Sequence, residues 1–108
     1  MNITVYAASS GQVPEVYTKA AARLGEILAE RGHTLINGAG RTGLMGATID
    51  ACLAKGGKAV GVIPQFMIDE SWQHKGMTDL IVTPNMHERK TLMAERADAC
   101  IACPGGVG

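Results

Sequence analysis

Apolar residues along the chain form five short runs that predict β-strands. Polar segments containing glycine or proline separate the runs, as is typical of the turns between regular elements. The run over residues 58–63 is apolar almost without interruption, which indicates a strand buried on both faces of a sheet. The predicted strands cover residues 3–7, 33–36, 58–63, 80–83 and 99–103.

Three longer segments have apolar residues at three- and four-residue spacing, which predicts amphipathic helices. Pro14 suits the first turn of the first helix, and Asn85 with Glu88 fits a capping box at the start of the third. Residues 65–78 have poor periodicity and are predicted to form a loop or short helix bordering a site. The predicted helices cover residues 14–31, 44–55 and 86–96.

Strands therefore alternate with helices along the chain. Neighbouring parallel strands need crossover connections, so this order predicts a parallel sheet covered on both faces, with right-handed crossovers. The fold class is α/β, a Rossmann-like three-layer α/β/α arrangement. A length of 108 residues allows one hydrophobic core, and we expect residues 1–108 to form a single Rossmann-like nucleotide-binding domain.

Composition and charge exclude several classes of protein. The chain is 46% hydrophobic and 19% charged, as in ordinary globular proteins. Ten basic and ten acidic residues leave no net charge to favour nucleic acid or an anionic membrane as a partner. No apolar run reaches the roughly 18 residues of a membrane span, and the N-terminus has no signal-peptide pattern. Three cysteines are too few for a disulfide scaffold, so we expect a cytoplasmic protein.

Gly38, Gly40 and Gly43 have G-x-G-x-x-G spacing between a predicted strand and a predicted helix. Bare backbone there can bring an anion close to the N–H groups at a helix N-terminus. The alternative is that these glycines only permit a tight turn and close packing. Classical dinucleotide binding is disfavoured, because the motif follows the second strand and the third ends at Pro64-Gln65 without an acidic residue.

A second glycine loop, Pro104-Gly105-Gly106-Val107-Gly108, follows the last predicted strand. Successive glycines can form a nest of N–H groups that suits a phosphate. Neither glycine loop is followed by Gly-Lys-Ser/Thr, so a Walker A site is excluded.

The basic pair Arg89-Lys90 lies in the first turn of a predicted helix. Cations there oppose the positive end of the helix dipole, at a cost of roughly 0.3 to 1 kcal/mol each. An anionic ligand would reverse the sign of this effect, and arginine can bind phosphate with two hydrogen bonds. The alternative is a solvated pair that Glu88 and Glu95 partly offset.

The cysteines and histidines give weaker signals. Cys100 and Cys103 have redox spacing, but residues three apart in a strand point to opposite faces, which favours core packing. His33, His74 and His87 lack metal-ligand spacing with the cysteines, so we expect no metal. No lysine stands in a context that indicates Schiff-base chemistry, and we expect no cofactor.

Three motifs together resemble the LOG family in order and spacing. They are Gly-Ala-Gly-Arg-Thr-Gly-Leu-Met-Gly at 38–46, Met-His-Glu-Arg-Lys at 86–90 and Pro-Gly-Gly-Val-Gly at 104–108. LOG proteins are cytokinin riboside 5′-monophosphate phosphoribohydrolases, also labelled possible lysine decarboxylases. The resemblance covers the whole chain. It implies a Rossmann-like homodimeric hydrolase that splits the N-glycosidic bond of a nucleoside 5′-monophosphate, such as AMP, into free base and ribose 5-phosphate.

The resemblance also implies the residues of the site. Arg89 corresponds to the residue usually described as catalytic, and Gly105 to Gly108 correspond to the start of the phosphate loop. A phosphate anchor is coherent with hydrolysis, in which the ribose gains oxocarbenium character in the transition state. The substrate-binding positions implied are Ser9, Gly40, Gly43, Glu70, Arg89, Lys90, Gly105, Gly106, Val107 and Gly108.

The sequence departs from the family pattern at several positions. Ala8 and Ala39 stand where the family usually has glycine, and Asn37 stands where it has tyrosine. The family's last motif continues Thr-x-x-Glu, whose glutamate is the expected carboxylate for hydrolysis. This sequence ends inside that motif at Gly108, so we expect the C-terminal part of the family fold to be absent. The alternative functions are nucleotide binding without catalysis, as in carrier proteins of similar fold, and a decarboxylase, which the old label alone supports.

Overall fold

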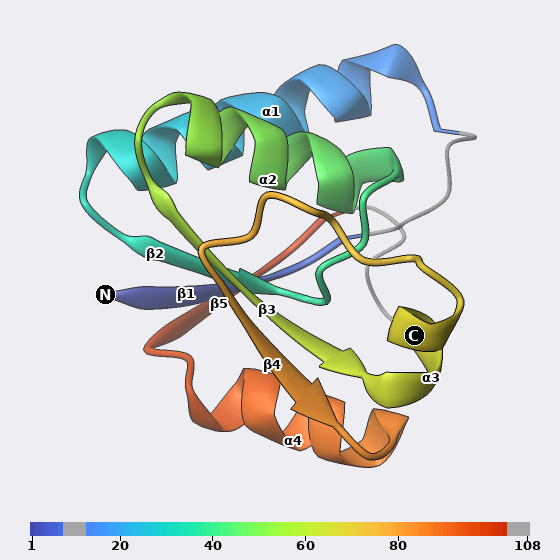
Figure 1. Cartoon of the computed structure of the whole chain (residues 1–108). Helices are drawn as coiled ribbons and strands as arrows, with labels where there is room; N and C mark the ends of the chain where they lie inside the picture. The colour runs from blue at the N-terminus through green and yellow to red at the C-terminus, as the bar shows by residue number, and fades with distance from the viewer. Residues whose placement is uncertain (8–12, 104–108) are drawn as a thin grey trace.

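The computed structural model describes residues 1–7 and 13–103, which form alternating strands and helices (Figure 1). Each predicted strand and each of the three predicted helices is confirmed to within one residue at either end. The segment without clear periodicity begins with one further short helix, α3, directly after the third strand. The elements are β1 (Asn2–Tyr6), α1 (Glu15–Glu30), β2 (Thr34–Asn37), α2 (Gly43–Ala54), β3 (Lys58–Pro64), α3 (Gln65–Asp69), β4 (Asp79–Thr83), α4 (Met86–Glu95) and β5 (Ala99–Ala102).

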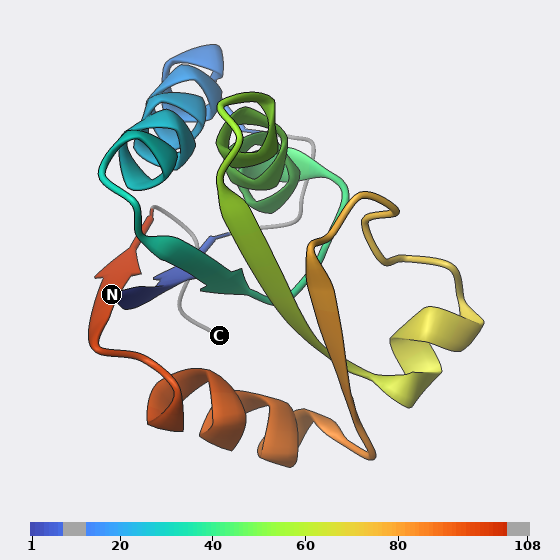
Figure 2. The same cartoon turned by 60° about the vertical axis from the view of Figure 1, so that its left-hand side comes forward.

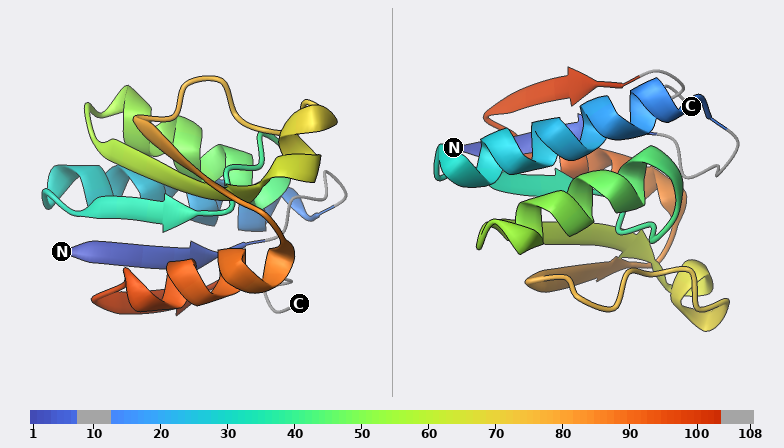
Figure 3. Two further views of the ribbon diagram at one scale, coloured as in Figure 1. Left: turned by 60° about the horizontal axis from the view of Figure 1, so that its bottom comes forward. Right: turned by 90° about the horizontal axis from the view of Figure 1, so that it is seen from above.

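The described strands form a single parallel sheet in the order β4-β3-β2-β1-β5. Helices α1 and α2 cover one face, and α4 lies on the other (Figures 1 and 2). Viewed from above, α1 and α2 run side by side across the sheet (Figure 3). These three layers confirm the predicted α/β Rossmann-like class.

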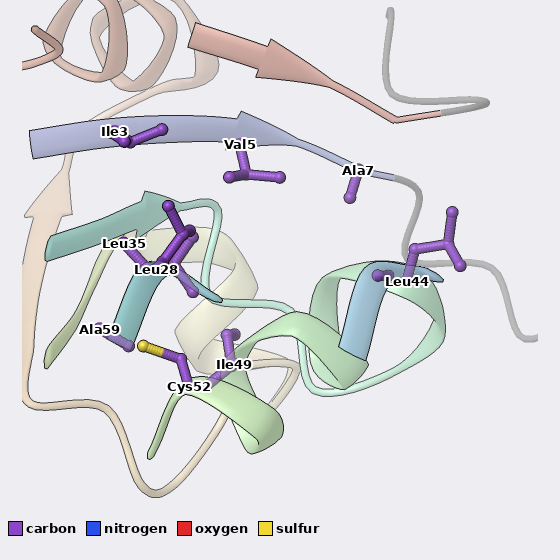
Figure 4. Packing of buried hydrophobic residues seen from close by; sticks show 10 residues of the cluster. Ile3, Val5, Ala7, Leu28, Leu35, Leu44, Ile49, Cys52 and Ala59 are labelled. Atoms are coloured by element: carbon purple, nitrogen blue, oxygen red, sulfur yellow. The ribbon is translucent and has the colours of Figure 1, made fainter. Parts of the chain in front are cut away.

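The main core lies between the sheet and the pair α1–α2. Val5, Leu35 and Ala59 project from three neighbouring strands and meet Leu28 of α1 and Ile49 of α2, all buried (Figure 4). The apolar side chains of adjacent parallel strands thus share one face, and the inner sides of two amphipathic helices cover it. This burial is the main stabilising contribution to the domain.

The two covering helices approach closely at Gly25 of α1. A Cβ at this position would lie 2.3 Å from the carbonyl oxygen of Thr48 in α2, well inside contact distance. Only a residue without a side chain fits between the two backbones. The contact fixes how α2, and therefore the loop that precedes it, sits on the sheet.

A second, smaller core holds α4 against the opposite face. It contains Ile36, Val62 and Met93, with one residue each from β2, β3 and α4. The buried hydroxyl of Thr4 donates a hydrogen bond to the carbonyl oxygen of Met93 at 2.7 Å. These contacts orient α4 so that its first turn reaches the carboxyl ends of β2 and β3.

At the other side of the sheet, β5 pairs with β1. The register aligns Ile3 with Ala99, and Asp98 and Asn2 exchange two hydrogen bonds, each 2.7 Å, just before the pairing begins. The site predictions at Ser9 and Gly105 to Gly108 lie outside the described residues. Within the described ranges no helix has both the length and the apolar character to cross a lipid bilayer.

Candidate functional site

The candidate site is formed where β2 and β3 end at the carboxyl edge of the sheet. The loop from Gly38 to Thr42 follows β2 and leads into α2, and α3 follows β3 directly. The first turn of α4 comes to the same edge from the opposite face. Ligands of open parallel α/β sheets bind at this edge, beyond the carboxyl ends of the strands.

Arg89 of α4 lies at the centre of this arrangement and is only 9% exposed. Its Nε donates a hydrogen bond to the carbonyl oxygen of Val62 at 2.9 Å, and its Nη2 donates to the carbonyl oxygen of Gly38 at 2.6 Å. Among the described residues, the hydrogen-bond partners of its Nη1 are the sulfurs of Met86 and Met67, at 3.5 and 3.7 Å. No acidic side chain of the described residues forms an ion pair with Arg89.

A buried cation without a carboxylate partner is costly, because the protein interior stabilises charge less well than water does. Burial accordingly lowers the pKa of Arg89. The guanidinium carries five N–H donors, and only two of its three nitrogens have an oxygen acceptor among the described residues. The site is therefore prepared for a negatively charged ligand, which would supply the missing charge and oxygen acceptors.

Gly38, the first glycine of the G-x-G-x-x-G pattern, makes room for this arginine. A Cβ at position 38 would lie 1.6 Å from Nη2 of Arg89 and 2.6 Å from its Cζ. A side chain at position 38 and the buried guanidinium therefore exclude each other. The glycine serves the close approach of an arginine from the opposite face of the sheet.

The turn after Gly38 is held by Asn37, which is fully buried. Its Oδ1 accepts a hydrogen bond from the backbone N–H of Ala39 at 2.9 Å. Ala39 has a φ of 63°, in the left-handed region that favours glycine. The position at which the family usually has glycine thus keeps a glycine-like conformation, and the Asn37 side chain supports it.

A cavity of about 360 Å³ opens beside Arg89. Its lining is mixed: Arg41, Thr42 and Arg89 are polar, whereas Met45, Ile63, Met67 and Trp72 are apolar. Thr42 directly precedes α2, whose first residue Gly43 has a φ of 63°, and Trp72 remains 51% exposed. The described lining residues are Gly38, Gly40, Arg41, Thr42, Met45, Ile63, Met67, Trp72 and Arg89.

The structure brings some of the predicted site residues to the cavity and leaves others away from it. Gly40 and Arg89 line the cavity, and Gly43 begins α2 beside it. Lys90 is exposed although it follows Arg89, because adjacent residues of a helix point about 100° apart. Glu70 is exposed at the end of α3 and is not one of the lining residues.

Several residues that line the cavity carry no clear functional signal in the sequence. Arg41 is one of them, and Met45 and Met67 are two others, because methionine is more often a residue of the core than of a binding site. Trp72 was placed only in a segment bordering a site. The spacing of Met86, Arg89 and Met93 carried a usable signal, because positions i, i+3 and i+7 share one helix face and would have placed the arginine on the buried side.

Cys100 lies in β5 and Cys103 follows the strand directly. The expectation of core packing is confirmed for Cys103 but is wrong for Cys100, whose side chain is exposed. Cys103 packs against the main core, and burial raises the pKa of its thiol. Cys100 is exposed and lies beside Tyr6, whose pKa is raised by burial and by the charge and hydrogen bond of Cys100. Across residues 1–7 and 13–103, no cluster of histidine, cysteine and acidic side chains has the composition of a metal site.

Known proteins match the chain over almost its whole length. A family model described as possible lysine decarboxylase matches residues 45–108. The chain belongs to this family. LOG is another name for the possible lysine decarboxylase family. The resemblance of the three motifs to the LOG family is therefore confirmed.

Curated relatives carry the name cytokinin riboside 5′-monophosphate phosphoribohydrolase. The relative from Mycobacterium tuberculosis is 42% identical over 106 residues, which are 98% of this chain and 56% of the relative. The relative from Rhodococcoides fascians is 42% identical over 108 residues, 99% of this chain and 54% of its own length. One from Oryza sativa is 40% identical over 106 residues, 98% of this chain and 44% of its own length. The chain therefore spans about half the length of these family members.

Solved structures share the fold. The molybdenum cofactor carrier protein of Chlamydomonas reinhardtii superposes with a TM-score of 0.83 at 24% identity, covering 99% of this chain and 63% of that protein. The molybdenum cofactor binding protein of Rippkaea orientalis gives a TM-score of 0.78 at 21% identity, and the match covers 99% of this chain and 61% of that protein. These likenesses concern the Rossmann-like fold of the family.

Proposed function

We propose that this protein hydrolyses the N-glycosidic bond of purine nucleoside 5′-monophosphates, such as AMP and cytokinin riboside 5′-monophosphate, to free base and ribose 5-phosphate. The observation that carries the proposal is the buried Arg89, which has no acidic partner among the described residues and lines a cavity that also has apolar lining residues. Such a cavity suits a ligand that is anionic at one end and aromatic at the other. The names of the curated relatives support the same substrate class.

In this proposal the polar and the apolar lining residues bind different parts of the nucleotide. The phosphate and ribose lie toward Arg89 and the start of α2, where the guanidinium and the helix dipole favour negative charge. The base lies against apolar lining residues, among which the Trp72 ring offers a stacking surface. As predicted from the resemblance, Gly105 to Gly108 and Ser9 complete the phosphate site, and Lys90 and Glu70 contribute to substrate binding.

Hydrolysis also needs a group that stabilises the oxocarbenium-like ribose and activates water. None of the described lining residues is a carboxylate. The carboxylate of the proposed reaction therefore comes from outside the described residues, in agreement with the glutamate expected from the family motif. The lining residues include no lysine either, so the described cavity offers no Schiff-base nucleophile for the decarboxylase alternative.

That no described lining residue carries a carboxylate also favours a second candidate function, nucleotide binding without turnover. It predicts saturable AMP binding with no release of adenine. From the family resemblance we further propose that the protein is a homodimer located in the cytoplasm, which size-exclusion chromatography with light scattering and cell fractionation would test.

The test is adenine release from AMP, followed by chromatography, for the full chain and two variants. Arg89→Gln removes the buried cation, and we expect loss of AMP binding and of adenine release. Arg23→Gln is the matched control, because Arg23 is an exposed arginine of α1 whose contacts are with Glu26 and Glu30. Equal activity of the Arg89→Gln and Arg23→Gln proteins would refute the role of Arg89, and binding without release would establish the second candidate.

A further inference from the structure

Residues 70–78, which connect α3 to β4 and are called the strap below, run beside the loop that follows β2. Gln73 of the strap forms an isolated antiparallel bridge with Gly40. The backbone N–H of His74 donates to the carbonyl oxygen of Ala39 at 2.7 Å. The strap is therefore bound directly to the glycine loop of the candidate site.

The side chain of His74 anchors the strap to α2. Its Nδ1 accepts a hydrogen bond from the backbone N–H of Gly76 at 2.9 Å, so Nδ1 carries no proton in this arrangement. The proton is then on Nε2, which donates to Oδ1 of Asp50 at 2.5 Å. The imidazole is only 15% exposed, whereas the Asp50 carboxylate, on the outside of α2, is 69% exposed.

The strap and the glycine loop that it contacts both supply residues to the cavity. Trp72 precedes His74 by two residues and lines the cavity. The backbone N–H of His74 donates to the carbonyl oxygen of Ala39. The preceding residue is Gly38, whose carbonyl oxygen accepts a hydrogen bond from Nη2 of Arg89. One hydrogen-bonded imidazole therefore fixes the position of Trp72 in the site and of the carbonyl oxygen that orients Arg89.

We propose that His74 and Asp50 are positioning residues of the nucleotide site. Neither touches the cavity; the His74–Asp50 pair holds the strap against the glycine loop, and the strap places Trp72 and the carbonyl oxygen of Gly38. The proposal rests on the proposed function only for the identity of the ligand, because the position of the strap can be measured without one.

The two hydrogen bonds of the imidazole can be removed separately. His74→Asn keeps an acceptor near the position of Nδ1 for Gly76 but cannot reach Asp50. Asp50→Ala removes the same bond from the other side, and Asp50→Asn keeps an oxygen acceptor for Nε2. We expect His74→Asn and Asp50→Ala to change Trp72 quenching and AMP affinity by the same amount, and their double variant to change them no further. Asp50→Asn should keep the wild-type values of both.

Trp72 is the single tryptophan of the sequence, so its fluorescence reports on the strap alone. In the ligand-free full chain we expect acrylamide to quench Trp72 more strongly in His74→Asn and Asp50→Ala than in wild type. AMP titration of the same signal should show about tenfold weaker binding, the effect of losing one hydrogen bond to a charged group. If turnover occurs, KM should rise by a similar factor with a smaller change in kcat.

Glu95→Ala is the control, because Glu95 is an exposed acidic residue at the end of α4, away from the strap. Unchanged Trp72 quenching and AMP affinity in folded His74→Asn and Asp50→Ala would overturn the proposal. So would values for Asp50→Asn that differ from wild type as much as those of Asp50→Ala. Asp50 is largely exposed, so its variants test the idea even if His74→Asn does not fold. Increased quenching together with no AMP binding by wild type would refute the proposed function and leave the positioning role standing.

Discussion

A methyl group at position 38 tests whether the first glycine of the motif exists to admit Arg89. In Gly38→Ala the new Cβ would lie 1.6 Å from Nη2 and 2.6 Å from Cζ of Arg89, whereas carbon atoms in contact are about 3.5–4.0 Å apart. The φ of Gly38 lies outside the left-handed region, so backbone strain does not contribute to the effect. The guanidinium has to leave its place.

The cost follows from the hydrogen bonds that this displacement breaks. Nη2 loses the Gly38 carbonyl oxygen and Nε loses that of Val62. Hydrogen bonds to charged groups are worth about 1.5–3 kcal/mol each, so the loss of two should lower the free energy of unfolding of Gly38→Ala by about 3–6 kcal/mol. In an Arg89→Ala background the clashing atoms are gone, and the same substitution should cost less than about 1 kcal/mol.

Urea unfolding followed by far-UV circular dichroism on the wild type, both single variants and the double variant gives the coupling energy directly. We expect the two positions to be coupled by about 2 kcal/mol or more, because Arg89→Ala removes the cause of the Gly38→Ala penalty. Additive effects within about 0.5 kcal/mol would refute the reasoning and show that Gly38 is needed for another reason.

Two further predictions follow from the backbone and from the thiols. Ala39→Gly should change the free energy of unfolding by less than about 1 kcal/mol, because relief of the left-handed conformation offsets the lost methyl group and the added chain entropy. The matched control Ala59→Gly, equally buried in β3, should cost about 1–2 kcal/mol in the same urea assay, and equal losses at both positions would contradict this explanation. In native alkylation followed by mass spectrometry, the exposed Cys100 should react first and Cys52 last, because Cys52 is fully buried and burial raises the pKa of its thiol. Early labelling of Cys52 would show that the main core opens in the native protein.

The elements were predictable because each depends on residues close together in sequence. The helix α4, for example, begins where the capping box placed it, and Oδ1 of Asn85 accepts a hydrogen bond from the N–H of Glu88 at 2.9 Å. The uninterrupted apolar run of β3 likewise becomes an inner strand with neighbours on both sides. Local spacing carries this information in full.

The site was less predictable because its contacts join residues far apart in the chain. Arg89 meets Val62 across 27 residues and Gly38 across 51, and His74 meets Asp50 across 24. No periodicity relates such positions, and each partner is an ordinary carbonyl group or an exposed acid when seen alone. The glycine pattern was visible in the sequence, but the part of Gly38 in admitting a guanidinium depends on the packing of α4 under the sheet.

The pairing of the first described strand with the last has a consequence for how the chain folds during synthesis. Asn2 and Asp98, which join β1 to the start of β5, are 96 residues apart. A ribosome adding about 5–20 residues per second needs roughly 5 to 20 s to cover that separation. For this interval one edge of β1 keeps its N–H and C=O groups unpaired, the kind of edge at which chains aggregate. A pause in translation before residue 99 prolongs this exposure, so synonymous codons upstream of β5 should influence the yield of folded protein without changing any contact of the finished structure.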